Sequence, residues 1–362
     1  MNSRQTVDPV HQLSISVDAM RLPIDGNKFR LRAYRTSDAR AVAELRSDPS
    51  TAEWQSWVVP YPLEKAQKMV NSVMELDGPT PGEWWGLVIA DPTTHAFMGN
   101  LAVHLADHGH SAEIGYALCV QHRGKGLASD ATEALINALF ARPEINRVEG
   151  SLHPGNIASA MVLERLGFVH EGTSRQSYWV EEVVSDDAHY GLLREEWSAW
   201  NDGAATRPTV VELAEITERN LDDVTTLATH HSQRRFVAPV YRSLAQALIK
   251  PLHKGEPVVP WYRAIVADDT VVGFVMLSDV SPTEPHPYVW RLLIDRAHQR
   301  RGIASKVLEL LVADRIAKGD TKLVLSYMPG LGSPEAFYRK HGFIPTGQID
   351  DGEIEASLDL KS

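Results

Sequence analysis

At 362 residues the chain exceeds the size at which a single hydrophobic core usually stops growing, so its length predicts two domains. Hydrophobic residues at 43% and charged residues at 23% are ordinary for a globular protein. The formal net charge of −11 disfavours nucleic acid and anionic membranes as partners and favours cationic ligands.

The single cysteine, Cys119, cannot form an internal disulfide or a cysteine metal cluster, which fits a reducing compartment. The N-terminus lacks a signal peptide pattern, and no apolar run approaches the roughly 20 residues of a membrane-spanning helix. We therefore expect a cytoplasmic protein. His104, His108 and His110 cluster without cysteine or paired carboxylate spacing, so no metal site is predicted.

The elements of the first half alternate in type. Residues 29–32 alternate as a strand, and Thr36 begins a helix that carries Val42 and Leu45. The remaining predicted elements are strands at 84–90, 97–105 and 114–120, a helix at 129–140, and a last strand or short helix at 190–200.

A polar stretch at 201–209 contains Gly and Pro and lacks periodicity, which predicts a linker. After it, strands at 210–213, 261–267, 271–278 and 288–294 and helices at 222–229 and 305–317 repeat the earlier order. The predicted organisation is an N-terminal extension (1–27, with one edge strand at 13–17), a first domain (28–200), the linker (201–209) and a second domain (210–362).

The strongest internal signal is a repeated loop of the form [Q/R]-x-x-G-x-[G/A]. It occurs in Arg123–Ser129, the first loop, and in Gln299–Ser305, the second loop, each between a predicted strand and a predicted helix. A Gly-Phe pair follows each loop, with Gly167 41 positions after Gly126 and Gly342 40 positions after Gly302. Two unrelated coincidences would not keep that spacing.

A glycine turn between a strand and a helix presents free backbone amides and a partial positive charge to a phosphate. In the first loop these contacts would come from Gly124, Gly126, Leu127, Ala128 and Ser129. In the second loop they would come from Arg301, Gly302, Ile303, Ala304 and Ser305. Further cationic charge for a pyrophosphate would come from Arg123, Lys125, Arg300 and Arg301.

The loops resemble the pyrophosphate-binding signature of the GNAT superfamily of acetyl-CoA-dependent N-acetyltransferases, and the resemblance begins near Lys28. The first domain, with Ala112–Tyr116 and Asn156-x-x-Ser159, is similar to ribosomal-protein N-terminal acetyltransferases. The second, with Trp290–Asp295 and Asp351–Glu353, is similar to bacterial spermine/spermidine acetyltransferases. The resemblance implies an α/β (α+β) fold class: two tandem domains, each a mixed, mostly antiparallel, splayed sheet flanked by helices. It also implies acetyl-CoA as the cofactor.

Direct attack of an amine on a thioester needs a base for the amine and an acid for the departing thiolate. In the first domain the resemblance implies that Glu113 is the base, although a solvated strand-edge glutamate is the alternative. Ser159 takes the thiolate donor's position near Asn156, a predicted cofactor contact, although these two side chains could instead cap a helix. The main chain of Cys119 and Val120 is expected to pair with the pantetheine arm, and the Cys119 side chain to be a buried small residue.

In the second domain the resemblance implies that Tyr338, four residues before Gly342, protonates the CoA thiolate, with a core aromatic as the alternative. Leu293 and Ile294 are implied cofactor contacts, and Gln299 holds the first position of the signature. Trp290 and the Pro329–Pro334 turn depart from the polyamine-type pattern on the acceptor side.

Three functions follow from these observations. The first is acetylation of a primary amine on a small polycationic metabolite, such as a polyamine or an aminoglycoside-like or peptide antibiotic, with a role in antibiotic resistance. The second is Nα-acetylation of a protein terminus. In the third, one domain is a non-catalytic acetyl-CoA-binding scaffold for the other. We expect a monomer that mimics a dimer, or a homodimer, and assign catalysis to the second domain in preference to the first.

Overall fold

The computed structural model describes residues 20–55, 57, 59–180, 183–204, 206–249, 252–253, 256–257, 259–279 and 285–360. The strand predicted at 13–17 lies outside them. The chain divides into two compact units, residues 1–146 and residues 147–362. This division does not coincide with the predicted linker, so the domain boundaries stay a prediction.

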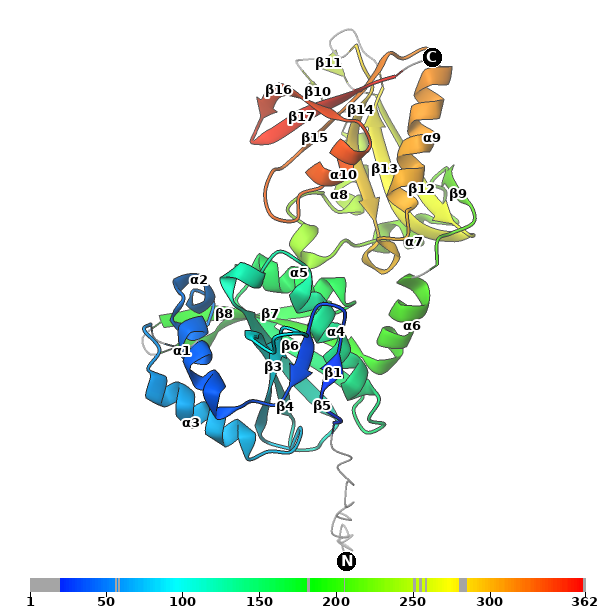
Figure 1. Cartoon of the computed structure of the whole chain (residues 1–362). Helices are drawn as coiled ribbons and strands as arrows, with labels where there is room; N and C mark the ends of the chain where they lie inside the picture. The colour runs from blue at the N-terminus through cyan, green and yellow to red at the C-terminus, as the bar shows by residue number, and fades with distance from the viewer. Residues whose placement is uncertain are drawn as a thin grey trace, which may run out of the picture. The chain divides into compact units, whose positions relative to one another are not determined.

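The first unit contains an antiparallel arrangement of strands in the order β1-β2-β3-β4-β5 (Figure 1). The strands are β1 (Ile24–Asp25), β2 (Arg30–Arg32), β3 (Trp84–Ala90), β4 (Phe97–Leu105) and β5 (Ser111–Leu118). A Cβ at Gly99 would lie 2.3 Å from the carbonyl oxygen of Ala117, so β4 and β5 approach each other closely because position 99 is glycine.

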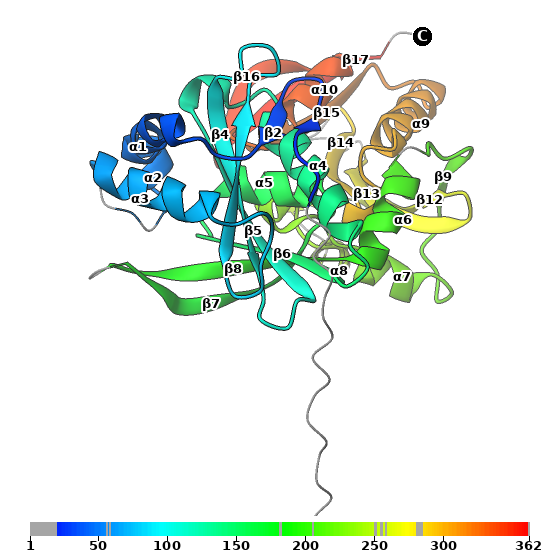
Figure 2. The ribbon, with the colours of Figure 1, turned by 60° about the horizontal axis from the view of Figure 1, so that its bottom comes forward.

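The helices of this unit include α1 and α3, which lie side by side in Figure 2. Their apolar faces bury Val42 and Val70 with Tyr34 and with Val88 of β3, in one core cluster. The helical elements are η1 (Thr36–Asp38), α1 (Ala39–Ser47), α2 (Pro49–Ala52), α3 (Leu63–Met74), η2 (Val120–His122) and α4 (Leu127–Phe140).

The second unit begins with three antiparallel strands in the order β6-β8-β7, followed by α6. The elements are β6 (Arg147–Leu152), α5 (Ile157–Arg165), β7 (Val169–Val180), β8 (Val183–Leu193) and α6 (Arg194–Ala204). Helix α6 continues four residues into the predicted linker, because the buried Trp197 anchors it and no proline interrupts it before Pro208.

The rest of the second unit is a sheet of seven strands in the order β16-β17-β15-β14-β13-β12-β9. The strands are β9 (Val211–Ala214), β12 (Pro260–Ala267), β13 (Thr270–Ser278), β14 (Tyr288–Ile294), β15 (Lys322–Tyr327), β16 (Ile344–Asp350) and β17 (Glu353–Asp359), and β10 (Leu252–His253) and β11 (Glu256–Pro257) form a separate pair. The helical elements are α7 (Leu221–Thr226), η3 (His231–Gln233), α8 (Val240–Leu248), η4 (Arg296–His298), α9 (Ile303–Ala317) and α10 (Glu335–Lys340).

Alternate residues of the central strands pack against helices on opposite faces of this sheet, as the two-residue period of a strand requires. Phe274 and Met276 of β13 belong to the cluster that contains Val224 of α7 and Val240 of α8. Val275 of β13 belongs instead to the larger cluster formed with α9 and α10. Both faces of the sheet are therefore covered, and the mixed, mostly antiparallel fold class is confirmed.

Strands β14 and β15 are parallel and pair only at their start, through Tyr288 with Val324 and Val289 with Leu325. On the other edge of β14, Met276 pairs with Arg291 and Leu277 pairs with Val289, so Trp290 is the extra residue of a bulge. The bulge turns β14 away from β15, and no described strand pairs with that edge of β14 beyond Val289. This is the predicted splay of the sheet.

Candidate active site

The two loops have the same backbone conformation. Cys119 and Asp295, which precede them, have φ/ψ angles of −57°/142° and −55°/142°. Gly126 and Gly302 at the N-caps of α4 and α9 have φ angles of 78° and 82°. The repeat predicted from sequence is therefore also a repeat of local structure, with equivalent residues 176 positions apart.

At both helix N-caps the glycine faces open space, and the amides that follow it have no acceptor within the helix. A Cβ at Gly126 would come no closer than 3.9 Å to another atom, the Asp130 carboxylate, and one at Gly302 no closer than 3.9 Å to Arg207 Nε. In the first hydrogen bond of each helix, the Asp130 amide donates to the Gly126 carbonyl and the Lys306 amide donates to the Gly302 carbonyl. Three amides at each helix start therefore have no acceptor within the helix, namely those of Leu127, Ala128 and Ser129 and of Ile303, Ala304 and Ser305. Such a helix start is suited to binding a phosphate.

The first residue of each signature braces the loop. Arg123 Nε donates a hydrogen bond of 3.0 Å to the carbonyl of Leu118, and Gln299 Nε2 donates one of 3.1 Å to the carbonyl of Ile294. The Arg123 guanidinium also donates to the hydroxyls of Ser50 and Thr51. These contacts favour a bracing role for Arg123 over the predicted contact with a pyrophosphate.

Other predicted phosphate contacts are engaged within the protein. Lys125 Nζ donates to the carbonyl of Gln121 at 2.8 Å, and Arg301 Nε donates to the carbonyl of Thr206 at 2.8 Å. Ser305 Oγ lies 2.9 Å from His341 Nε2. Backbone amides are therefore the principal phosphate ligands that the loops offer.

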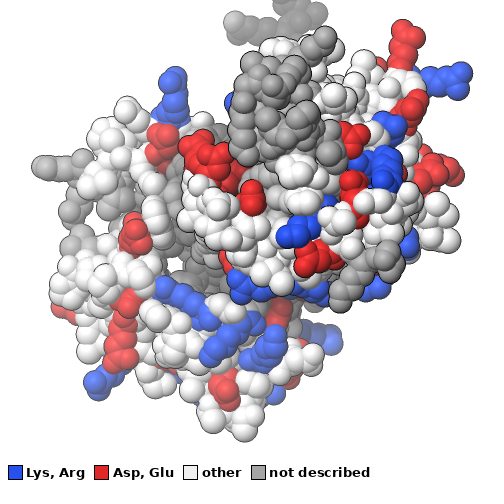
Figure 3. Space-filling view, turned by 90° about the horizontal axis from the view of Figure 1, so that it is seen from above, with Lys and Arg blue, Asp and Glu red and all other residues white. Residues whose placement is uncertain are grey.

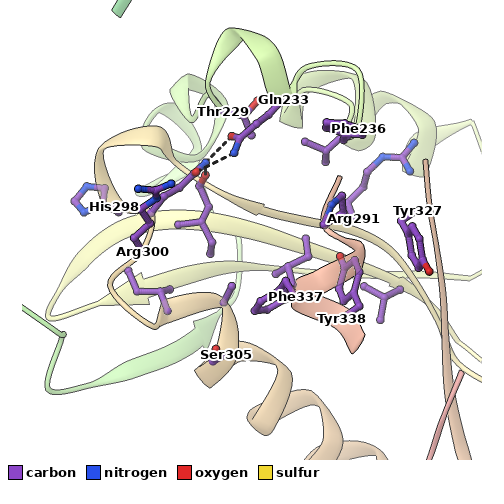
Figure 4. A pocket seen from close by; sticks show the side chains of 18 of the residues that line it. Thr229, Gln233, Phe236, Arg291, His298, Arg300, Ser305, Tyr327, Phe337 and Tyr338 are labelled. Carbon is purple, nitrogen blue, oxygen red and sulfur yellow. Dashed lines mark hydrogen bonds between the residues drawn. The ribbon is translucent and has the colours of Figure 1, made fainter. Parts of the chain in front are cut away.

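A cavity of about 550 Å³ opens beside the second loop, between β14, α10 and the segment around η3 (Figure 4). Its wall includes Ile294, Gln299, Arg300 and the start of α9 from Gly302 to Ser305. It also includes Val289, Trp290 and Arg291 along the splayed edge of β14. An extended ligand that places a phosphate at the loop can therefore run along an unpaired strand edge, to which it can add as a further strand.

The pantetheine contacts predicted for the two domains do not lie at equivalent positions of the two loops. Leu293 and Ile294 correspond to Ala117 and Leu118, which lie two residues before the predicted Cys119 and Val120. The Cys119 amide donates to Met98 at 2.9 Å and its carbonyl accepts from His122 at 2.9 Å, while the Val120 carbonyl accepts from Arg123 at 3.2 Å. The Cys119 amide and carbonyl each already make one hydrogen bond, and the pairing of Cys119 and Val120 with a pantetheine arm stays a prediction. Sequence reasoning missed Ala117 and Leu118.

The thiol of Cys119 is half-buried, and burial raises its pKa. A thiol that stays protonated is a weak nucleophile.

Tyr338 lies in α10 with only 8% of its surface exposed, and it lines the cavity in Figure 4. Tyr327 and Phe337 pack around its ring, with centroids 6.1 Å and 5.3 Å away. Burial raises the pKa of Tyr338, so the phenol remains a proton donor at neutral pH. This geometry suits the predicted general acid, although the same ring also belongs to the core.

The residues predicted for the first domain fall in separate units. Glu113 is half-buried in β5 opposite His104 of β4, in residues 1–146. Asn156 and Ser159 are in residues 147–362, where the Asn156 side chain accepts a 3.1 Å hydrogen bond from the Ser159 amide and caps α5. The structure shows the capping role for the Asn156 side chain, and the catalytic roles of Glu113 and Ser159 stay predictions.

Four cations line the cavity, and no Asp or Glu does so among the described residues. They are Arg207, Arg291, Arg300 and Lys340. Sequence reasoning missed Arg207, because it lies in the segment assigned to a linker, and it assigned no role to Arg291 or Lys340. Acidic and basic side chains are interspersed on the face in Figure 3, whereas the charged side chains that line the cavity are all basic among the described residues.

The part of the chain that the structure describes contains no group of three or more His, Cys, Asp or Glu placed to hold a metal ion. Likewise, none of its helices is both long and apolar enough to cross a membrane.

A splayed sheet, a helix start with free amides and a buried tyrosine beside the gap are the arrangement expected of a transferase that uses an acyl-CoA thioester. The family model described as "Acetyltransferase (GNAT) domain" matches residues 28–169, and the one described as "Acetyltransferase (GNAT) family" matches residues 225–343. The chain belongs to the GNAT acetyltransferases and carries two such domains in tandem. It is an acyltransferase, and its family uses acetyl-CoA.

The chain is similar to several proteins that are named as acetyltransferases. An uncharacterized N-acetyltransferase, p20, from Bacillus licheniformis is 27% identical over 47% of this chain and 96% of its own length. A putative ribosomal N-acetyltransferase, YdaF, from Bacillus subtilis is 37% identical over 28% of this chain and 56% of its own length. A GNAT-family acetyltransferase structure from Bacillus anthracis is 22% identical and covers 48% of this chain and 99% of its own, with a TM-score of 0.44.

Proposed function

We propose that the cavity of the second domain is an acetyl-transfer site and that this domain acetylates a small primary amine. The observation that carries the proposal is the continuity of the phosphate-binding start of α9, the splayed edge of β14 and Tyr338 along one cavity. When bound, acetyl-CoA supplies an acetyl group activated as a thioester. The amides of Ile303–Ser305 hold its phosphates, and the unpaired edge of β14 orients its extended arm.

Tyr338 gives its proton to the sulfur as the carbon–sulfur bond breaks, while the amine nitrogen forms the new bond to the carbonyl carbon. The proton that leaves the nitrogen needs an acceptor, and no carboxylate lines the cavity among the described residues. Ser326 does line it, and the Ser326 hydroxyl donates a hydrogen bond to the Glu353 carboxylate. We assign Glu353 as the base, receiving the proton through Ser326.

The cationic lining bears on the predicted polycationic acceptor. A polyamine or aminoglycoside needs carboxylates that pair with its ammonium groups. The described wall offers Arg207, Arg291, Arg300 and Lys340 instead. This disfavours a polycation, and with it the predicted antibiotic-resistance role, at this site.

A second candidate function concerns the first domain. Curated relatives include a putative ribosomal N-acetyltransferase of Bacillus subtilis and a ribosomal protein uS5-alanine N-acetyltransferase of Escherichia coli, the latter 25% identical over 32% of this chain. These names support Nα-acetylation of a protein terminus by the first domain, with Glu113 as the base and Ser159 as the thiolate donor.

The test is a screen of primary amines and N-terminal peptides with acetyl-CoA, read by thiol release, on the parent chain and on Tyr338→Phe and Ser159→Ala. For small amines we expect Tyr338→Phe to reduce turnover by roughly 10²-fold and Ser159→Ala to have almost no effect. The reverse pattern would assign the chemistry to the first domain. Calorimetric titration with CoA separates the scaffold alternative, because two bound cofactors with one active domain would indicate a retained binding module.

A further inference from the structure

The cavity has two chemically different ends. Figure 4 shows His298 and Arg300 at the end formed by the second loop, and Arg291 beside Phe236 toward the other end, near Tyr327. Under the proposed function the phosphates occupy the loop end and the thioester lies at Tyr338. The acceptor would then bind at the end of the cavity that contains Arg291.

Three of the four cations are accounted for by the phosphates. Arg207 lies over Gly302, with its Nε 3.9 Å from where a Cβ would stand, and Arg300 is in the loop itself. Lys340 lines the cavity from the end of α10, next to His341, whose Nε2 contacts Ser305 Oγ at 2.9 Å, and we assign it to the loop end as well. Arg291 is the cation without such a partner.

The guanidinium of Arg291 makes only neutral hydrogen bonds in the part of the chain that the structure describes. It donates to the carbonyl of Trp290 at 2.7 Å and, weakly, to Gln246 Oε1 at 3.4 Å, and its Nε is buried without a partner. Glu353 attracts it from a distance, but that carboxylate accepts its hydrogen bond from Ser326. The nearby Arg242 repels it, and burial lowers the pKa of Arg291.

Other buried arginines of this protein are paired with carboxylates. Arg32 contacts Asp38 at 2.7 Å, and Arg315 contacts Asp279 at 2.7 Å, with their own side chains 8% and 1% exposed. A half-buried guanidinium without a carboxylate is costly, and an anionic ligand removes that cost. Arg291 therefore has the environment of a ligand-binding residue.

We propose that Arg291 binds a carboxylate of the acceptor, and that the acceptor of the second domain is a small amino acid with a free carboxylate. The inference rests on the proposed function. Phe236, Trp290 and Tyr327 form an apolar and aromatic wall at the same end, which fits an apolar amino-acid side chain. The guanidinium fork matches a carboxylate in shape and charge.

The experiment compares phenylalanine, phenylalaninamide, 2-phenylethylamine and a dipeptide as acceptors, with thiol release as the readout. We expect the parent to prefer phenylalanine over its amide and its amine by roughly 10- to 100-fold in kcat/KM. A dipeptide used equally well would extend the acceptor class to peptide carboxylates rather than free amino acids.

Arg291→Gln should lower kcat/KM for phenylalanine by the same factor and leave the amide and the amine unchanged, with CoA affinity kept. Arg242→Gln is the matched control, because it removes an exposed positive charge nearby without altering the cavity wall, and it should keep the preference. Equal use of acid and amide by the parent, or an equal loss with all acceptors in Arg291→Gln, would overturn this inference alone. Turnover insensitive to Tyr338→Phe would instead overturn the proposed function, and an absence of turnover with every acceptor would overturn both.

Discussion

Gly302 offers the sharpest test of the cofactor site, because a matched glycine lies at the other end of the same helix. Gly302 precedes α9 with a φ of 82°, and Gly319 follows it with a φ of 83°. A Cβ at Gly302 would meet only Arg207 at 3.9 Å, and one at Gly319 would meet nothing within 4 Å. Both positions therefore accept a side chain sterically, and both impose the same left-handed strain of roughly 1–2 kcal/mol.

Gly302→Asp places a carboxylate where the phosphates bind, and Gly319→Asp places one far from them. Two unit charges about 4 Å apart repel by roughly 4 kcal/mol at the effective dielectric constant of a protein surface. Rotation of the side chain and solvent relieve part of this, so we expect at least about 2.7 kcal/mol, or roughly 100-fold, in CoA affinity at this site. Folding stability should fall in both variants, and less in Gly302→Asp, because a carboxylate is favourable at a helix N-terminus and unfavourable at a C-terminus.

The assay is calorimetric titration with CoA, after thermal unfolding has shown that both variants are folded. Gly302→Asp should lose one binding site, and Gly319→Asp should bind as the parent does. Gly126→Asp extends the comparison to the first loop and should remove the other site. Equal CoA binding by Gly302→Asp and Gly319→Asp would refute the assignment of phosphate binding to the start of α9.

Further predictions concern the proton-transfer groups and acid stability. Tyr338→Phe should lower turnover roughly 10²-fold with CoA affinity unchanged. Tyr327→Phe, in the same aromatic cluster, should leave turnover unchanged, and an equal loss of turnover in both variants would indicate a packing effect. Glu353→Gln should lower turnover roughly 10²-fold at neutral pH and progressively less as pH rises and free amine accumulates, and a loss independent of pH would exclude its role as base. Glu113→Gln should do the same for peptide acceptors of the first domain, and full activity of this variant would remove that assignment. Burial lowers the pKa of His230 from 6.5 to about 4, so its folded pKa lies below its unfolded pKa. The contribution of His230 to the free energy of unfolding is therefore present above pH 6.5 and is lost as pH falls toward 4. His230→Gln should reduce the acid-induced drop in the free energy of unfolding by roughly 2–3 kcal/mol. An unchanged drop would exclude His230 as its source.

The residues around the two loops were predictable because their structure is local. An apolar strand, a glycine with positive φ and a helical period follow one another directly along the sequence. The strands predicted at 84–90, 97–105 and 288–294 agree with β3, β4 and β14. The repeat of the signature at a constant offset identified the second copy. Gly99 and Gly273 form a further pair, since at each position a Cβ would lie 2.3–2.4 Å from a backbone oxygen, and the sequence analysis did not match these two glycines.

The chemistry of the cavity was not predictable in the same way. Its wall combines Arg207 from a supposed linker, Arg291 from the bulged strand and Tyr338 from a short helix, which are far apart in sequence. Composition could not predict the charge of this site, because the net charge of −11 sums the whole chain while the described wall of the cavity carries cations. By itself the sequence determined the tandem acetyltransferase family and supplied candidates for the cofactor loops and the general acid, since these depend on neighbouring residues. Only the tertiary structure decided which loop side chains are already bonded, where β14 leaves β15 and which charges line the cavity, since each depends on distances between remote segments.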